Sequence, residues 1–502
     1  MNGALMKASS RFAIAAALGL VVGVGSVRAA DLGGNCCADL EERVAELEAT
    51  TARKGNRKMS LTITGQVNRV ITWWDDGHSS KVYYGLDNTN SSSRFSLLGE
   101  ARVNPSVKMG FEIMIEIEVG GTSSKASQFD EDGKNAIFGV AALTAPGATV
   151  PPVYGVGLTS ANSANVDAYF GDARRVAWWI EHKDLGRLTV GRFESAGVVN
   201  TIDLAGISVV GGSSSALLNG SFFIRDALNR TLAVTFATIG DPAATQGRSE
   251  LVRYDSPSWN GFIYSSSVGE AGDYWGTMLR YASEFSGFRV AAGIGYERIS
   301  DRASGTVIGP LDAGFFGIQP DITAWGGSLA FLHVSSGLFI QGHYLAADYF
   351  NPVAPGAGSN YWGQTLSPST VAKSPANQWL IQGGIAKNWF GVGNTALYAE
   401  YGVSNDWGAS AGAGRQFDVD PTTAGCQVTS PAGPLGSGLT GLCNVTDTKL
   451  TLFGLGIVQN FDAAATELYL GYRKFEPEIT NAGVGVAVED FHQITGGARV
   501  KF

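Results

Sequence analysis

The residue types that perform nucleophilic or metal chemistry are few in this sequence and stand far apart. A hydrolase needs a nucleophile with a general base in reach, and the sequence has neither a GxSxG nor an HExxH motif. We therefore expect no enzyme, and in particular no lipase or protease, and no cofactor. The five histidines are His78, His182, His333, His343 and His492.

The four cysteines fall into two settings. Cys426 and Cys443 lie in a Gly-, Pro- and Thr-rich segment, where an oxidising compartment would allow a disulfide worth about 3 kcal/mol. The alternative is two free thiols. Cys36 and Cys37 are adjacent and cannot easily pair with each other, and the preceding residues do not suit a lipidation site. No histidine or CxxC motif lies near either pair, so we expect no metal site.

Residues 1–29 have the features of a secretory signal peptide. Lys7 and Arg11 precede the apolar run FAIAAALGLVVGV, and small residues around Arg28 suit cleavage after Ala29. The alternative is a buried core helix. Cleavage would remove three basic residues and change the formal net charge from -9 to -12. An acidic exported chain is a poor candidate for nucleic-acid binding, so no nucleic-acid partner is expected.

Residues 30–57 predict a short amphipathic helix. Leu40, Val44 and Leu47 recur at helical spacing among glutamates, over about two heptads. Two heptads are too short for a stable coiled coil on their own. The helix would therefore be either a stalk in an already assembled trimer or a solvated, charged leader.

From Ser60 onward the dominant hydrophobic period is two, which is typical of β-strands. Charged residues make up only 16% of the chain and the mean hydropathy is +0.05, which does not suit a helical membrane protein. Apolar and ionised residues alternate through the hairpin Arg94–Val119 in strands of about 10 to 13 residues. A soluble sandwich and an outer-membrane barrel both fit this alternation, but the strand length favours the barrel. Its lumen-facing residues would include Glu100, Arg102, Glu112, Glu116 and Glu118.

Sixteen segments carry this pattern, and an even number closes an antiparallel barrel with both chain ends on one side. Short turns such as NPS and EFSG alternate with long loops between them. We predict that residues 58–502 form a sixteen-stranded antiparallel transmembrane β-barrel. The segments are Ser60–Trp74, Arg94–Val103, Val107–Val119, Ala168–Glu181, Arg187–Phe193, Glu250–Asp255, Phe262–Val268, Trp275–Glu284, Phe288–Glu297, Thr323–His333, Leu338–Asp348, Gln378–Trp389, Thr395–Val403, Thr448–Gln459, Thr466–Phe475 and Asp490–Phe502.

Two further features concern the membrane and the closing of the wall. Aromatic residues near strand ends are candidates for interfacial girdles in contact with outer-membrane lipid, with core anchors as the alternative. The last strand stops at Phe502, which suits barrel closure and recognition by the barrel assembly machinery. The girdle candidates are Trp73, Trp74, Trp178, Trp179, Trp259, Trp275, Trp389 and Tyr472.

The connection within Leu185–Asp226 differs from all others. After the short strand LGRLTVGR comes a long segment that reads as no regular strand, and it is not needed to close the wall. We expect this segment to fold inside the barrel and to determine which solutes pass through the pore. The following stretch, SFFIRDALNRTLAVTFATI, predicts an additional local hairpin inside or above the barrel.

Five stretches resemble the Gram-negative general porins, and within them the alphaproteobacterial group. They are SSSRFSLLGEARVNPSVKMGFEI, LGRLTVGR, ELVRYDSPSWNGF, YWGTMLRYASEFSGFRVAAGIGYE and GGARVKF. The resemblance implies an outer-membrane homotrimer of sixteen-stranded barrels, narrowed at mid-height by the third long loop. It also implies passive diffusion of ions and small hydrophilic solutes, selected by size and charge.

The resemblance also implies the residues of the constriction. Arg94, Arg192 and Arg253 occupy positions where the family places wall arginines. Arg192, however, is four residues after the apolar Leu188, so in a regular strand both side chains would point to the same face. Asp203 is the first choice for a loop acid that faces these arginines. Glu194 and Asp226 are the next candidates.

Two other interpretations stay open. A substrate-specific channel for a sugar or an anion would hold its solute at a saturable site. A structural role would use the 30–57 helix to tether the barrel to the envelope.

Overall fold

The computed structural model describes most of the chain after residue 58. The described residues are 59–117, 121–128, 131, 172–212, 218–229, 231–240, 247–269, 274–300, 321–350, 376–407, 427–429, 439–442, 445–481 and 483–502. Several predictions fall outside them: the signal peptide at 1–29, the helix at 30–57, Glu118 and all four cysteines.

Sixteen antiparallel strands form a closed barrel. Each strand pairs with its neighbour along the wall, and β22 pairs with β1 to complete the ring. All sixteen segments expected from the period-two pattern are strands of this wall, so the predicted fold is confirmed. The strands are β1 (Ser60–Asp75), β3 (Arg94–Asn104), β4 (Val107–Glu116), β5 (Asp172–His182), β6 (Gly186–Glu194), β9 (Arg248–Asp255), β10 (Phe262–Gly269), β11 (Tyr274–Phe285), β12 (Phe288–Ile299), β13 (Asp321–His333), β14 (Leu338–Phe350), β15 (Ala376–Lys387), β16 (Thr395–Asn405), β19 (Val445–Phe461), β20 (Thr466–Asn481) and β22 (Phe491–Lys501).

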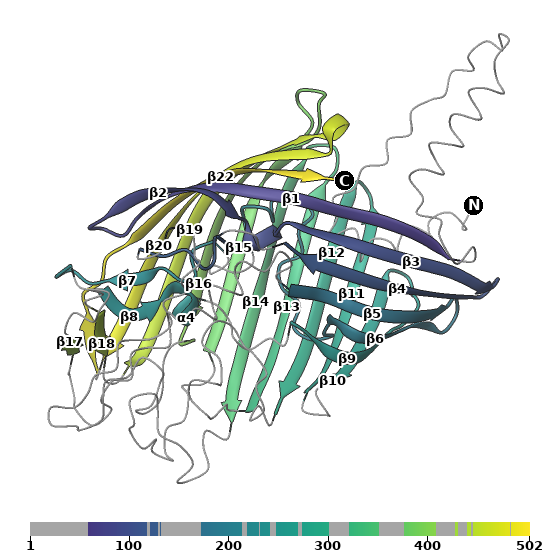
Figure 1. Cartoon of the computed structure of the whole chain (residues 1–502), viewed down its shortest axis with the longest axis horizontal. Helices are drawn as coiled ribbons and strands as arrows, with labels where there is room; N and C mark the ends of the chain where they lie inside the picture. Colours follow the sequence, from purple (N-terminus) through teal and green to yellow (C-terminus); the bar gives the residue numbers. More distant parts are fainter. Residues whose placement is uncertain are drawn as a thin grey trace.

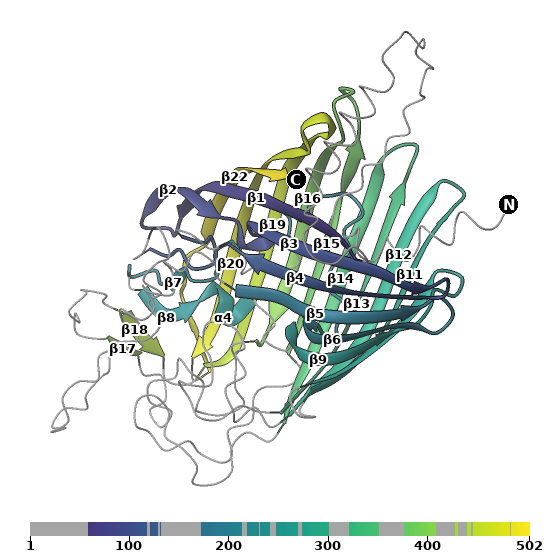
Figure 2. The same cartoon turned by 45° about the vertical axis from the view of Figure 1, so that its right-hand side comes forward.

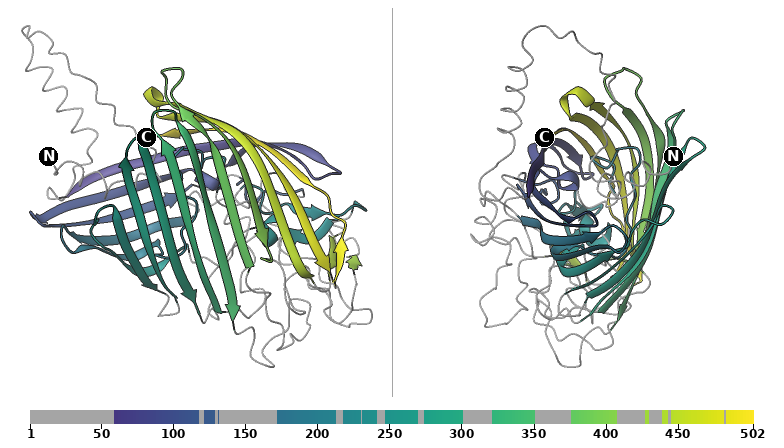
Figure 3. Two further views of the ribbon diagram at one scale, coloured as in Figure 1. Left: turned by 180° about the vertical axis from the view of Figure 1, so that it is seen from behind. Right: turned by 90° about the vertical axis from the view of Figure 1, so that its right-hand side faces the viewer.

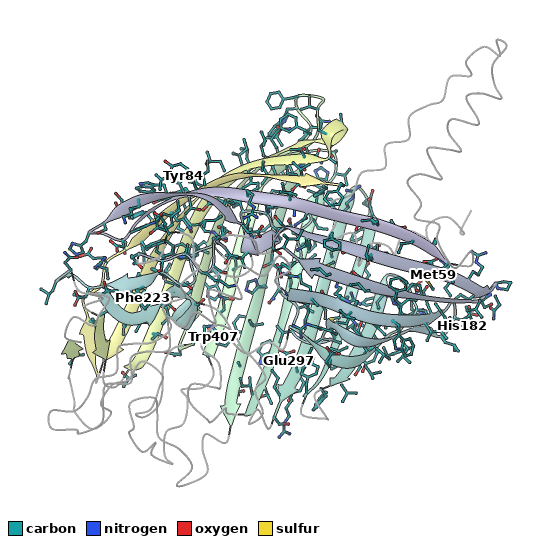
Figure 4. The ribbon with its side chains drawn as sticks, in the orientation of Figure 1. Met59, Tyr84, His182, Phe223, Glu297 and Trp407 are labelled. Carbon is teal, nitrogen blue, oxygen red and sulfur yellow. The ribbon has the colours of Figure 1, made fainter. Side chains whose placement is uncertain are left out.

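The strands are strongly tilted. In Figure 1 the strands β1, β3, β4 and β5 cross in front of β12 to β16, because tilted strands on the near and far walls run in different directions. Short turns join strands at one end, here called the turn end, and long connections leave the other, here called the loop end. Figure 4 shows His182 at the turn end and Phe223 at the loop end.

The outer face of the barrel is apolar. On β1, Ile63, Val67 and Ile71 are each at least half exposed, whereas Gln66 and Asn68 between them are buried on the inner side. The same alternation recurs around the wall, as expected for a barrel whose outer face meets lipid. Among the described residues, no helix is long and apolar enough to cross a bilayer.

The aromatic residues at strand ends divide into two groups. Trp178, Trp259, Trp275 and Trp389 are exposed, as an interfacial girdle requires. Trp74 and Trp179 are buried on the inner side, so for these two the core-anchor alternative holds.

Additional elements occupy the loop end. The predicted local hairpin is confirmed: β7 (Phe223–Arg225) pairs antiparallel with β8 (Thr231–Thr235), and the short helix α4 (Phe236–Gly240) follows. Figure 2 and Figure 3 show these elements within the curve of the wall. The other additional elements are β2 (Ser80–Asp87), η1 (Thr89–Ser91), β17 (Gln427–Thr429), β18 (Leu439–Leu442), η6 (Asp462–Ala464) and β21 (Val484–Val486).

An apolar core joins the hairpin to the wall. Phe222 packs against Trp74 and Phe491, with ring centroids 5.2 and 5.0 Å apart, and Phe236 packs against Phe491 at 4.9 Å. Phe475 of β20 joins the same core. The core therefore fills part of the loop end on the side of β1, β20 and β22.

Candidate channel constriction

Residues 195–212, called the inner loop below, leave β6 and lie against the inner face of the wall. The loop crosses β10 and then β13 and β14, and its backbone is held by neutral side chains of these strands. Such bonds satisfy backbone groups that would otherwise be buried without partners. The backbone bonds are Ala196 N to Ser267 Oγ (2.7 Å), Ile202 N to Ser328 Oγ (2.8 Å) and Leu204 N to Gln341 Oε1 (3.1 Å). A side-chain bond also joins Thr201 Oγ1 and His343 Nδ1 (2.5 Å).

Glycines of β12 make room for this loop. A Cβ atom at Gly295 would lie 1.9 Å from the carbonyl oxygen of Gly197. A Cβ atom at Gly293 would lie 2.8 Å from a methyl group of Val199. The absence of these side chains therefore lets the loop lie flat against the wall.

The far end of the inner loop reaches the first long connection. Asn88 donates its side-chain amide to the carbonyl oxygen of Val209 (2.8 Å), and Asn90 donates to that of Ser208 (2.5 Å). The loop is thus fixed at both ends and along its length. Asn200, Gly206 and Ser208 are exposed to the lumen side.

Asp203 is the only ionisable residue of the inner loop. Its carboxylate accepts from the backbone N–H groups of Ala205 (3.0 Å), Gly206 (2.9 Å) and Ser208 (2.7 Å), and from the Gln341 side chain (3.2 Å). In the described part of the chain no basic group lies within 4.0 Å of it. Asp203 therefore shapes the loop and fastens it to β14.

Asp226 lies elsewhere, at the loop end. It is buried, its carboxylate accepts from the Leu228 N–H (3.0 Å), and its backbone forms a bridge with Val488. Its neighbour Arg225 pairs with Asp76 at 2.8 Å. The structure places Asp226 in the hairpin region and not with the wall arginines.

The opposite half of the inner wall is charged. Arg94 of β3 stands opposite Gln66 on one side and Glu116 on the other. The charges that act most strongly on it are those of Arg174, Glu116 and Arg499. Within the described residues no carboxylate oxygen lies within 4.0 Å of the Arg94 guanidinium. Arg94 is thus a cation that no single acid neutralises.

Two adjacent arginines of β5 both reach this surface. The register between β4 and β5 shifts at Met114, so β5 has one extra residue there. Such a bulge lets consecutive side chains share a face. Arg174 forms an ion pair with Glu116, and Arg175 pairs with Glu112 (2.8 Å) and Glu194 (2.7 Å). Sequence reasoning missed both, although the adjacent charges in GDARRVAWW break the period of two.

Further basic groups extend the charged surface in both directions. Towards β9 and β11, Arg248 lies 3.9 Å from Glu194, and Asp255 pairs with Arg253 (2.8 Å) and Arg280 (2.9 Å). Towards β20 and β22, Arg499 and Lys501 share Glu467. We call this surface the charged belt. It consists of the cations Arg94, Arg174, Arg175, Arg248, Arg253, Arg280, Arg499 and Lys501 and the acids Glu112, Glu116, Glu194, Asp255 and Glu467.

Arg192 lies apart from the belt. It stands opposite Val176 and Glu250 in the register, and Val176 is 47% exposed on the outer face. Residues directly opposite each other in an antiparallel pair point to the same face. Arg192 donates its Nε–H to the carbonyl oxygen of Ala173 (2.7 Å).

The other residues expected in the lumen divide between the belt and the turn end. Glu112 and Glu116 are members of the belt. Glu100 pairs with Lys108 at 2.7 Å near the turn, where Arg102 is also exposed. These two therefore lie at the channel's turn end and away from the inner loop.

A family model described as Gram-negative porin matches residues 15–480 of this sequence. The chain belongs to this porin family. It forms a diffusion channel in the outer membrane, and its family and fold are those of a channel and not of an enzyme. The alphaproteobacterial subgroup stays a prediction.

Solved structures with a similar fold include OmpT of Vibrio cholerae, at 13% identity over 90% of this chain and 99% of that one, with a TM-score of 0.46. An anion-selective porin from Comamonas acidovorans has 14% identity over 88% and 100%, with a TM-score of 0.45. OmpF of Salmonella typhi has 11% identity over 89% and 99%, with a TM-score of 0.43. A search of curated protein sequences finds no match.

Proposed function

We propose that the narrow part of this porin lies between the inner loop and the charged belt. Ions and small hydrophilic solutes cross it by passive diffusion and are selected by size and charge. The belt supports this proposal because it has eight cations and five acids, an excess of three positive charges, on one side of the lumen. The loop opposite has one acid, which its own backbone surrounds.

The expected selectivity follows from this imbalance. Charges in a narrow, protein-lined passage act more strongly than charges in bulk water, because the surrounding medium has a lower dielectric constant. An excess of guanidinium groups raises the local concentration of anions and lowers that of cations. We infer a weak preference for anions, in which Arg94 contributes most directly because no carboxylate lies within 4.0 Å of it.

Planar-bilayer recording of the purified protein tests both parts of the proposal. We expect conductance that rises linearly with salt concentration and a reversal potential on the anion side. Arg94→Ala and Arg253→Ala should each move the reversal potential towards cations. An unchanged reversal potential in both variants would contradict the role of the belt, and the absence of any conductance would contradict the channel.

We also propose that Cys426 and Cys443 form a disulfide. Both lie outside the described residues, but they directly flank β17 and β18. These strands are antiparallel, and their pairing places Gln427, the residue after Cys426 in the sequence, opposite Leu442, the residue before Cys443. Directly opposite residues in such a pair have Cα atoms about 4.5 to 5.5 Å apart, within the range that a disulfide allows.

Peptide mapping by mass spectrometry without reductant tests the disulfide. It should recover one cross-linked peptide pair that contains both cysteines. Alkylation of both thiols before any reductant is added would contradict the proposal.

The assembly of the porin is a further proposal. We infer a homotrimer, which the family supports, with the apolar outer band in contact with outer-membrane lipid. Phe502 fits recognition by the barrel assembly machinery because it is an aromatic residue directly after the closing strand β22: its N–H donates to the Gly65 carbonyl (3.0 Å) and its ring lies over Gly65. Conductance steps in groups of three would support the trimer. Deletion of residues 31–54 should leave those steps intact if the predicted helix is only a stalk.

A further inference from the structure

The segment that contains β7, β8 and α4 is fastened to the wall at both of its ends. We call it the cap; it consists of residues 218–229 and 231–240. At its start, the Leu218 carbonyl accepts a hydrogen bond from the Gln493 side chain of β22 (2.9 Å). At its end, the Gly240 carbonyl accepts from Gln378 of β15 (2.8 Å) and from Ser404 of β16 (3.3 Å). The cap therefore reaches from β22 to β15, past β20, β19 and β16.

Apolar side chains pack the cap against the inner faces of these strands. Phe222 lies 5.2 Å from Trp74 of β1, and Phe236 lies 5.5 Å from Phe475 of β20, measured between ring centroids. The helix α4 also contacts β16 and β19. A two-stranded hairpin is marginally stable on its own in water, so this packing is what holds the cap in a defined position. Figure 2 and Figure 3 show its elements inside the curve of the wall.

A buried ion pair fixes the cap to the turn between β1 and β2. Arg225 donates to the Asp76 carboxylate from Nη2 (2.8 Å) and Nε (3.1 Å), and to the Thr231 hydroxyl from Nη1 (2.8 Å). Gln128 donates to the same carboxylate (3.3 Å) and exchanges two hydrogen bonds with the backbone of Phe223 (2.7 and 2.9 Å). Because the Asp76 side chain is only 2% exposed, loss of its cation would leave a charge buried without a partner.

Backbone hydrogen bonds hold the cap to the neighbouring connections as well. The Glu489 N–H donates to the Arg225 carbonyl (2.8 Å), and the Ala227 N–H donates to the Ala487 carbonyl (3.0 Å). The Ser221 N–H donates to the Ser124 carbonyl (3.1 Å). The cap can therefore leave the wall only if several bonds break together.

The cap and the inner loop lie at different heights of the wall. On β20, a Cβ atom at Gly471 would lie 2.6 Å from a methyl group of Val210 in the inner loop. The cap meets the same strand at Phe475, where Phe236 packs, four residues nearer the loop end. Four residues span about 14 Å along an antiparallel strand, and somewhat less along the axis of a barrel with tilted strands. A solute from the loop end therefore meets two successive levels.

We propose that the cap is a second size filter at the loop end of the channel, and that Arg225 is the residue that positions it. The cap occupies the side of the lumen along β15, β16, β19, β20 and β22. Large hydrophilic solutes such as oligosaccharides are excluded at this level, before they reach the inner loop and the charged belt, while ions and small solutes pass. The inference rests on the proposed channel.

Polymer exclusion on the natural protein is the first test. Poly(ethylene glycol) of increasing size is added to one side of a planar bilayer at a time, and a polymer that enters the channel lowers its KCl conductance. The largest polymer that enters should differ between the two sides, because the cap narrows one entrance. Equal limits from both sides would overturn the proposal.

Two variants connect the smaller limit with the cap. Arg225→Met removes the cation that pairs with Asp76, and Gln128→Leu removes the two hydrogen bonds to the Phe223 backbone. Each should raise the smaller limit towards the larger one and leave the larger one unchanged. Arg289→Met is the matched control, because Arg289 forms an exposed pair with Glu284 near the turn end, and it should change neither limit.

A reversible lock separates movement of the cap from a general loosening of the barrel. Asp226 of the cap and Val488 form an antiparallel bridge, so cysteines at these two positions are close enough for a disulfide. In Arg225→Met with Asp226→Cys and Val488→Cys, oxidation should restore the natural smaller limit, and reduction should raise it again. Arg225→Met without the two cysteines should not respond to either treatment.

The outcomes are distinct for the cap and for the channel. An unchanged smaller limit in Arg225→Met and Gln128→Leu, or the same limit in the locked and reduced protein, would overturn the filter. If Arg225→Met does not assemble, the natural protein and Gln128→Leu decide the matter. A missing KCl conductance in the natural protein would instead overturn the proposed function.

Discussion

The two halves of the inner wall differ in how they use polar residues. The half formed by β20, β22, β1, β3 to β6 and β9 to β11 has the charged belt, in which acids and arginines alternate and basic groups are in excess. The half formed by β12 to β16 holds the inner loop mainly with serine, glutamine and histidine side chains. The comparison indicates that the inner loop narrows the passage on one side, while the charged belt on the other side selects solutes by charge.

Where the two halves meet, β20 and β16 contribute one more ion pair, but that pair is balanced and buried. Arg473 donates to Glu400 at 2.7 Å, and both side chains are almost fully buried behind the inner loop. Gln382 donates to Glu400 (2.8 Å) and receives a hydrogen bond from Gln341 (3.0 Å). This network links the wall to the residue that fastens Asp203, and it adds no net charge to the lumen.

The largest effect should come from breaking this network. Arg473→Met leaves the Glu400 carboxylate buried without its partner, which should cost about 3–5 kcal/mol of folding stability. Urea unfolding of the purified barrel, followed by gel mobility, measures the loss. Lys449→Met is the control, because Lys449 and Glu478 form an exposed pair, and it should cost at most about 1 kcal/mol. Equal losses of folding stability in Arg473→Met and Lys449→Met would contradict a larger contribution from the buried pair.

A smaller effect should follow from filling the space that the inner loop uses. Gly295→Val places side-chain atoms where the Gly197 carbonyl now lies, so the loop has to move away from β12 and towards the belt. We expect a loss of about 1–3 kcal/mol and a lower single-channel conductance. Gly485→Ala is the control, since a Cβ atom there meets no other atom within 4 Å. Unchanged conductance in Gly295→Val would contradict the position of the loop.

The smallest effect should come from neutralising the loop's acid. Asp203→Asn keeps an oxygen acceptor for the Ala205 and Gly206 N–H groups, so the loop should stay in place. The reversal potential should change much less than in Arg94→Ala, because the Asp203 carboxylate already accepts hydrogen bonds from the loop backbone and from Gln341. A shift as large as that of Arg94→Ala would show that Asp203 contributes to the field in the passage.

The fold could be read from the sequence because a barrel wall repeats one pattern. Lipid on one side and water on the other enforce a period of two through all sixteen strands, and the same alternation places Arg94 and Arg253 on the inner side. The hairpin at β7 and β8 was also predictable, because turn residues separate two apolar runs there.

The site was less predictable because its decisive features break that period. The bulge before Arg175 turns both Arg174 and Arg175 towards the lumen. In a strand with strict alternation, one of the two side chains would point to the lipid instead. The role of Asp203 depends on hydrogen bonds to its own backbone, which leave no periodic signal in an irregular loop. Glu194 belongs to the belt because it lies where β6 ends, which spacing alone does not reveal.

The central claim, that solutes pass between the inner loop and the charged belt, is tested most directly at Ser208. This residue is exposed on the loop, so Ser208→Cys should react with thiol reagents that enter the channel. We predict that an anionic methanethiosulfonate reacts faster than a cationic one, because the belt concentrates anions, and that complete labelling reduces the single-channel conductance relative to the unsubstituted protein. Equal reaction rates for the two reagents, or full conductance after complete labelling, would contradict the account.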